Sequence, residues 1–244
     1  MTPKAQMIRF INTTRRQLAK RTGCIERLIT GQSAFGASAQ PGYGVPGGMQ
    51  PGALVNPYPA GTVQGAAVNP CQTIVGQERY PFQGFFNPIL KQQYPGADAV
   101  IDAKSVSVNW GGTVRPTIAW LPWEDLQAFG RAYATLVTSY PYYWSVFNDG
   151  ENGEIWFFPA PSTQGDIELN AYCTPSPLYN DSDVEAIPSG FHDAIKYGAA
   201  ALALAATYRY QEAQYMESQY MSTLGVDSVA RDRGKVPQFY QPSL

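Results

Sequence analysis

The sequence predicts an α+β fold: a layer of N- and C-terminal helices packed with an antiparallel β-layer. Helical patterns lie near both ends of the chain, at residues 3–21 and 188–225. Short apolar runs bounded by turn residues fill the region between them. The 244 residues suit one large domain or two small ones. We therefore expect residues 1–30 and 188–225 to form the helical layer and residues 78–187 a β-rich platform.

The composition argues against several functional classes. The formal net charge is −2 and only 15% of the residues are charged, so no global charge favours nucleic-acid binding. There is no apolar run of about 18 residues, so no membrane span is expected. The N-terminus is too polar for a secretory signal. Cys24, Cys71 and Cys173 are odd in number and widely spaced, which is typical of reduced thiols.

Residues 3–21 are predicted to form a helix, with Thr2 as its N-cap and Pro3 at its first position. One apolar stripe contains Met7, Ile11, Thr14, Leu18 and Ile25. Residues 1–27 also contain seven basic residues and one acidic residue. The basic residues could contact phosphate groups, or they could be solvated or paired with acidic neighbours. We favour the second interpretation, because a run of charges on a helix is usually a solvated face, and Phe10 is the one aromatic residue among these charges.

Residues 31–77 form a Gly/Pro-rich insertion arm that contains no charged residue. Its first forty residues, 31–70, include nine glycines and six prolines. Such a segment cannot bury enough apolar surface to order itself. It could be a flexible surface arm, or an extended arm ordered against another subunit or partner. Scattered apolar residues such as Tyr43 and Leu54 slightly favour the second interpretation.

A β-hairpin is predicted from residues 104–110 and 114–120. The first segment alternates apolar and polar residues, and Gly111-Gly112 can form the tight turn between the two. Pro116 indicates that the second strand lies at the edge of its sheet.

Residues 142–147, 154–158 and 166–172 are predicted to form a three-stranded antiparallel meander, because turn residues separate three apolar runs. Residues 79–83 are expected to be briefly extended and to continue into a loop. Residues 121–130 are expected to form a short helix.

The region 188–225 is predicted to be one long helix of about 50 Å, since only Gly198 interrupts it before Gly225. Ser189 is a candidate N-cap. One apolar stripe contains Phe191, Ile195, Leu202, Ala206, Ala213, Met216, Tyr220 and Leu224. A second stripe contains Tyr197, Ala201, Leu204, Tyr208 and Tyr215.

A helix that is apolar on two sides usually packs against two surfaces. It could be the central core helix of a monomer, which periodicity alone favours. Alternatively, the second stripe could contact a neighbouring copy, and these five residues are our candidate subunit interface.

Residues 226–244 are expected to form an extended C-terminal tail, because they show no periodicity and contain several prolines. The tail contains three basic residues followed by two aromatic ones: Arg231, Arg233, Lys235, Phe239 and Tyr240. It could be a frayed terminus, or it could dock into a groove on a partner.

No catalytic, metal-binding or cofactor-binding residues are predicted. His192 is the only histidine, and its place in the first turn of a helix favours a hydrogen bond to a nearby carbonyl group. The cysteines are too far apart for a zinc site. Glu151 and Glu154 could act as a glycosidase pair. A carbohydrate-active or cell-wall-degrading tail protein is therefore the alternative function.

Two parts of the sequence resemble head-to-tail adaptor (connector) proteins of short-tailed bacteriophages, including the tail tubular protein A type. The first is Tyr-Tyr-Trp-Ser-Val-Phe-Asn-Asp at 142–149, followed by Ile-Trp-Phe-Phe-Pro-Ala-Pro at 155–161. The second is Phe-His-Asp-Ala-Ile at 191–195, followed by an Ala-rich helix. The resemblance covers most of residues 1–27 and 78–225, and it offers no counterpart for residues 31–70.

The resemblance implies a non-enzymatic virion protein in the neck between head and tail, assembled in the host cytoplasm. Such adaptors form rings of about twelve copies beneath the portal protein. Their C-terminal tails dock onto the portal, which makes the five tail residues named above candidate portal-binding residues. Their far side holds the tail nozzle or tail fibres, and double-stranded DNA passes through the channel without sequence-specific binding. A tail or capsid protein that forms no ring is a further alternative.

Overall fold

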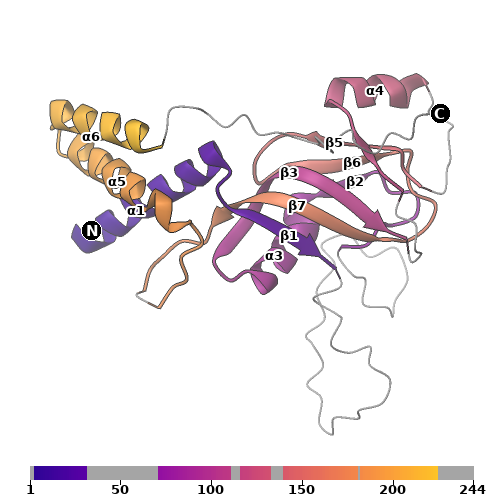
Figure 1. Ribbon diagram of the computed structural model, residues 1–244, viewed down its shortest axis with the longest axis horizontal. Coiled ribbons are helices and arrows are strands. Elements are labelled where there is room, and N and C mark those ends of the chain that lie inside the picture. Colours follow the sequence, from indigo (N-terminus) through magenta and orange to yellow (C-terminus); the bar gives the residue numbers. More distant parts are fainter. Residues whose placement is uncertain (1–2, 32–70, 111–115, 133–139, 181, 225–244) are drawn as a thin grey trace, which may run out of the picture.

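Helices from the two ends of the chain form one part of the molecule, and strands from its middle form the other (Figure 1). The computed structural model describes residues 3–31, 71–110, 116–132, 140–180 and 182–224. The helical part consists of α1 (Pro3–Thr22), α5 (His192–Ala206) and α6 (Tyr210–Thr223). The predicted α+β class is confirmed.

The strands form two sheets that contribute to one hydrophobic core. The three-stranded sheet has the order β1-β7-β3, with β1 at Glu26–Thr30, β7 at Asp166–Pro175 and β3 at Ala97–Asn109. The four-stranded sheet has the order β2-β6-β5-β4, with β2 at Arg79–Pro81, β6 at Glu154–Phe158, β5 at Tyr143–Phe147 and β4 at Ala119–Trp120. All neighbouring strands are antiparallel except β4 and β5.

The predicted hairpin is wrong, because its two strands lie in different sheets. β3 pairs with β7, whereas β4 pairs in parallel with β5. The turn expected at Gly111-Gly112 lies outside the described residues. Alternation of apolar and polar residues shows which face of a strand is buried, but it does not show which strand lies beside it.

The predicted meander is correct for two of its three strands. β5 and β6 are antiparallel neighbours, as expected. β7 is not the third strand, because it lies between β1 and β3 in the other sheet. Its partner β3 is a strand of 13 residues, which gives β7 a long antiparallel ladder.

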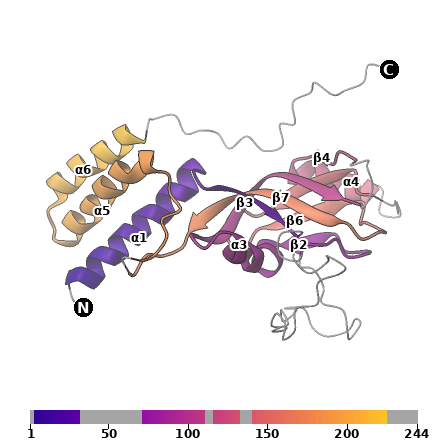
Figure 2. The same ribbon diagram turned by 60° about the horizontal axis from the view of Figure 1, so that its bottom comes forward.

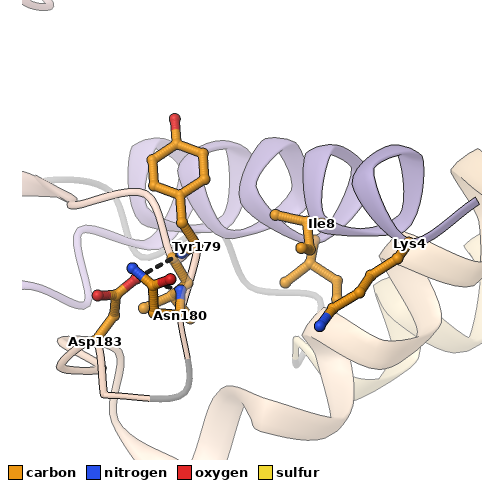
Figure 3. A pocket seen from close by; sticks show the side chains of 7 residues that line it. Lys4, Ile8, Tyr179, Asn180 and Asp183 are labelled. Atoms are coloured by element: carbon orange, nitrogen blue, oxygen red, sulfur yellow. Dashed lines mark hydrogen bonds between the residues drawn. The ribbon is translucent and has the colours of Figure 1, made fainter. Parts of the chain in front are cut away.

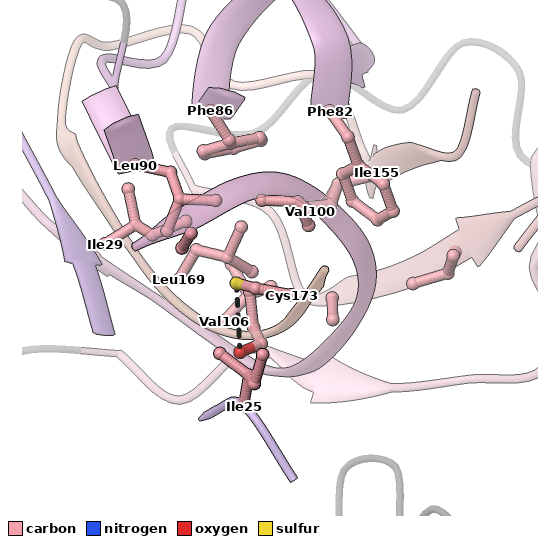
Figure 4. Packing of buried hydrophobic residues seen from close by; sticks show 14 of the residues in the cluster. Ile25, Ile29, Phe82, Phe86, Leu90, Val100, Val106, Ile155, Leu169 and Cys173 are labelled. Atoms are coloured by element: carbon pink, nitrogen blue, oxygen red, sulfur yellow. Dashed lines mark hydrogen bonds between the residues drawn. The ribbon is translucent and has the colours of Figure 1, made fainter. Parts of the chain in front are cut away.

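A helical segment replaces the loop expected after β2. The π-helical turn η1 (Phe82–Phe86) leads directly into α3 (Asn87–Gln93). Together they bury five side chains in the shared core: Phe82, Phe85, Phe86, Ile89 and Leu90. Figure 4 shows Phe86 and Leu90 beside Val100 of β3. Pro88 is compatible with the helix because it lies in the first turn.

Residues 26–30, which were expected in the helical layer, form strand β1 instead. Helix α1 ends at Thr22, and Gly23 follows with a left-handed φ of +62°. A Cβ atom at Gly23 would lie 2.8 Å from the Tyr172 ring. This close approach and the left-handed backbone explain the glycine, and they turn the chain from helix to sheet.

The last residues of the predicted arm belong to the β-rich part. Thr73 is buried, and its backbone N–H donates to the carbonyl group of Gly165 at 2.8 Å. The N–H of Gly165 donates to Thr73 Oγ1, also at 2.8 Å. Residues 32–70 lie outside the described part of the chain. The short helix expected at 121–130 is present as α4 (Trp123–Ala132).

The predicted single long helix is wrong, because the chain breaks between α5 and α6. Tyr208 adopts a left-handed φ of +63°. The N–H groups of Tyr208 and Arg209 donate to the carbonyl groups of Ala205 and Leu204, which closes the end of α5. The two helices then lie side by side as a helical hairpin (Figures 1 and 2). No glycine or proline marks this break, which is why the pattern read as continuous.

Helix α5 lies close to α1 at Gly198. A Cβ atom there would lie 2.5 Å from Thr14 Cγ2 and 3.2 Å from the Tyr220 ring. A glycine inside a helix usually weakens it, so this position is explained by the packing of the three helices.

We expect Gly198→Ala to destabilise the protein by about 1–3 kcal/mol, because overpacking outweighs the better helix propensity of alanine. The free energy of unfolding from urea denaturation measures the effect. Gly190→Ala is the matched control, since a Cβ atom there meets nothing within 4 Å. Equal stability of the two variants would show that the helices have room to separate at Gly198.

Candidate assembly surfaces

An ion pair between a buried arginine and a half-buried glutamate joins the helical layer to the β-rich part. Arg15 of α1 is 1% exposed, and its Nε and Nη2 atoms donate to the two carboxylate oxygens of Glu185 at 2.9 and 2.7 Å. Its Nη1 atom donates to the Ser176 carbonyl at 2.8 Å. The expectation that basic residues of this helix pair with acidic neighbours is confirmed for Arg15.

Asn12, one turn before Arg15, fixes the same loop. Its side-chain nitrogen donates to the Leu178 carbonyl, and its side-chain oxygen accepts from the Leu178 N–H, both at 2.9 Å. Residues 176–187 connect β7 to α5. Two side chains of α1 therefore hold the connection between strand and helix in place.

The pKa of Glu185 reflects the same geometry. Burial by itself would raise this pKa, but hydrogen bonds from Arg15 and from the backbone N–H of Ile187 bring it below its ordinary value. Glu185 is therefore a carboxylate at neutral pH, and it provides the counter-charge for the guanidinium group.

An open groove of about 310 Å³ lies beside this joint, between α1 and residues 178–183 (Figure 3). Ile8 and Lys4 line it from the helix, and Asp183 lies on the loop. The Asp183 carboxylate accepts hydrogen bonds from the backbone N–H groups of Asn180 and Tyr179, and these hold its pKa below the usual value. Asp183 thus shapes its own loop, and among the described residues it is the only carboxylate that lines the groove.

The candidate interface residues on the helical hairpin divide into two groups. Tyr197, Tyr208 and Tyr215 are exposed, at 36%, 80% and 61%. Ala201 and Leu204 are half-buried. The structure also exposes Tyr210, which the predicted stripe had missed, and places its ring 6.2 Å from that of Tyr208.

The first apolar stripe is only partly buried within the chain. Ile195, Ala213 and Tyr220 are buried, as expected. Ala206 is exposed, because it lies at the end of α5 next to the break. The five candidate portal-binding residues all lie in 225–244, outside the described part of the chain.

An aromatic cluster on the β-rich part was not predicted. The Trp123 ring of α4 lies 4.6 Å from Trp156 and 4.8 Å from Phe147, measured between centroids. The guanidinium carbon of Arg79 lies 4.0 Å from the Trp156 ring. Ile155 and Phe157 are buried on β6, so the alternation along this strand could have indicated that Trp156 faces the other side. The cluster borders a groove of about 480 Å³ next to the start of α4.

The residues considered for catalysis have structural partners. The Glu154 carboxylate accepts a hydrogen bond from Trp156 Nε1 at 3.2 Å. His192 Nε2 lies 3.3 Å from the Ile187 carbonyl oxygen, as expected. Burial raises the pKa values of the Cys71 and Cys173 thiols to about 12, so both remain protonated at neutral pH.

Within the part of the chain that the structure describes, no three His, Cys, Asp or Glu side chains are grouped to hold a metal ion. None of the helices found there has both the length and the apolar character needed to cross a membrane.

The SU10 adaptor protein family matches residues 3–238 of the chain. The chain belongs to this family. The match also spans residues 31–70, for which the resemblance had offered no counterpart. No curated protein matches the chain. The family consists of phage adaptor proteins, so this SU10 family member is a bacteriophage structural protein of the virion neck, with a role between head and tail.

We expect Glu185→Gln to lower the free energy of unfolding by about 3 kcal/mol, because Arg15 would remain buried without a counter-charge. Urea denaturation at pH 7 measures this loss. Glu26→Gln is the control: Glu26 pairs with Lys104, both side chains are 38–40% exposed, and such pairs contribute under about 1 kcal/mol. Similar losses in both variants would contradict the role given to the buried pair.

The stability difference between the wild type and Glu185→Gln should depend on pH. The pKa of Glu185 is lowered in the folded protein, so the carboxylate stabilises the fold fully above its unfolded pKa of about 4.3. This stabilisation is lost as the pH falls through the pKa that Glu185 has in the folded protein. Denaturation curves should therefore show a constant difference from pH 7 to about 5 and a smaller one below about 4.3. A difference that grows on acidification would be the opposite of this expectation.

Proposed function

We propose that this adaptor assembles into a closed ring of about twelve copies that joins the portal ring to the tail, the copy number being the one that the resemblance implies. The proposal rests on the exposed tyrosines of the α5–α6 hairpin. This hairpin belongs to the helical layer of a chain from a phage adaptor family. Large exposed aromatic side chains are typical of contact surfaces. The subunit interface would contain Tyr197, Ala201, Leu204, Tyr208 and Tyr215.

The parts of the chain would then have different tasks. Residues 1–25 and 188–225 would build the ring, and the arm at 31–70 would meet another subunit or partner. The platform at 78–187 would face the tail nozzle or tail fibres, with the half-buried aromatic cluster around Trp123 and Trp156 as part of that surface. The tail at 226–244 would dock onto the portal through Arg231, Arg233, Lys235, Phe239 and Tyr240.

The protein would act without catalysis or cofactors and would assemble in the host cytoplasm. Double-stranded DNA would pass through the ring without a sequence-specific site. A formal net charge of −2 per copy supports this, because a negatively charged ring does not attract DNA as a whole.

Deleting residues 229–244 should abolish capture of the protein by purified portal rings. Two buried aromatic side chains remove about 150–250 Å² each from water, and repetition around a ring multiplies the effect through avidity. Pull-down with portal rings measures capture, and the mass of the particle with and without the portal gives the copy number.

Two full-length variants separate the contributions within the tail. Phe239→Ala with Tyr240→Ala should weaken capture more than replacing the three basic residues with Gln, since charges at an interface rim chiefly affect association rate and specificity. If the truncated chain binds portal rings as tightly as the full chain, the contact lies in the helical layer instead.

A further inference from the structure

The helical layer has two open edges with different chemistry. Helix α5 packs against both α1 and α6, so α1 and α6 form the two sides of the layer (Figure 2). Head-to-tail association in a ring needs two different patches on each copy. The two edges of this layer could supply these two patches.

The α1 edge carries a stripe of cations, Arg9, Arg16 and Lys20, here called the cationic stripe. Their spacing places them on one face of the helix, and all three are exposed. Leu18 and Ala19 are fully buried on the other side of α1. Arg16 is only loosely paired, 3.7 Å from Asp98. Within the described part of the chain, no carboxylate pairs with Arg9 or Lys20.

Three exposed tyrosines lie at the start of α6 and are here called the tyrosine edge: Tyr208 lies in the turn before the helix, and Tyr210 and Tyr215 lie in its first two turns. They are 80%, 58% and 61% exposed. Helix α6 contains the acidic residues Glu212 and Glu217 and no basic residue, whereas α1 contains basic residues and no acidic one. Glu212 is already paired with Arg209, which directly precedes α6, so Glu217 is the acidic residue that complements the cationic stripe.

Tyr208 gives a second, independent indication. Its left-handed φ of +63° is costly for a residue with a Cβ atom, and glycine or asparagine would fit the turn with less strain. Its ring is 80% exposed, so the fold of the single chain makes little use of it. A bulky aromatic side chain held outward by a strained backbone is an arrangement suited to binding.

Cations stacked on aromatic rings already occur in this fold. Arg79 lies 4.0 Å from the ring of Trp156, and Arg27 lies 5.2 Å from the ring of Tyr94. Arginine and tyrosine are also enriched among the residues that dominate binding energy at protein interfaces.

We propose that the tyrosine edge of one copy packs against the cationic stripe on α1 of the next copy. Arginine and lysine side chains lie over the tyrosine rings, and Glu217 supplies a counter-charge. This inference rests on the proposed ring and names the surface that each subunit presents to its neighbour.

Two variants with opposite defects test the pairing. The first carries Tyr208→Gly, Tyr210→Ala and Tyr215→Ala, which removes the tyrosine edge. The second carries Arg9→Gln, Arg16→Gln and Lys20→Gln, which removes the cationic stripe. Each variant alone should be monomeric. An equimolar mixture should form dimers but no rings, because each dimer contains one intact interface and no second one with which to continue.

The single substitution Tyr208→Gly tests the same contact without the three simultaneous changes of the larger variants. Its melting temperature should equal or exceed that of the wild type, while its assembly should be at least tenfold weaker. Tyr179→Ala is the matched control, since Tyr179 is 69% exposed but lies on the loop beside the groove of Figure 3. Its assembly should be unchanged.

Different results would overturn the proposed pairing and the proposed ring. If the wild type forms rings and both triple variants also form rings, or if their mixture stays monomeric, the pairing is wrong while the ring stands. If the second variant still forms rings, the cationic stripe is not the subunit contact, and it would face DNA or another partner instead. If the wild type stays monomeric even with portal rings, the proposed ring itself fails.

Discussion

The buried pair between Arg15 and Glu185 is the contact on which the arrangement of the two parts depends. A guanidinium group that is 1% exposed needs a complete set of acceptors, and it finds them on the loop that connects β7 to α5. Removing one acceptor would leave a buried charge, so the loop has little freedom to move. The orientation of the helical layer relative to the sheets follows from this constraint, together with the paired hydrogen bonds of Asn12.

The break at Tyr208 decides which surface the helical layer presents. A continuous helix would have carried its apolar stripes past the end of the domain. The turn instead folds α6 back onto α5, so that Ala213 and Tyr220 are buried and the remaining tyrosines face outward. A strained residue at the turn and an exposed ring are thus two consequences of one backbone conformation. This links a local feature of the backbone to the proposed contact between copies.

Two of the acidic residues in the described part of the chain already have structural partners. The carboxylate of Glu154 is engaged by an indole N–H, and the loop backbone engages Asp183. Aromatic side chains gather in two places: exposed tyrosines lie on the helical hairpin, and a half-buried cluster lies around Trp123 on the β-rich part. Two aromatic surfaces at separate parts of one chain agree with a protein that joins different neighbours.

The α+β class, helices α1 and α4, the β5–β6 pair and the family could be predicted from the sequence, because they depend on local periodicity, turn residues and short motifs. The other features depend on contacts between distant parts of the chain. The partners of β3 and β7 depend on which long strands can share a ladder, and alternation along one strand carries no such information. The break at Tyr208 has no glycine or proline to announce it, and its stability comes from packing α6 against α5. The pairing of Arg15 with Glu185 joins residues 170 positions apart, a contact that exists only once the chain has folded.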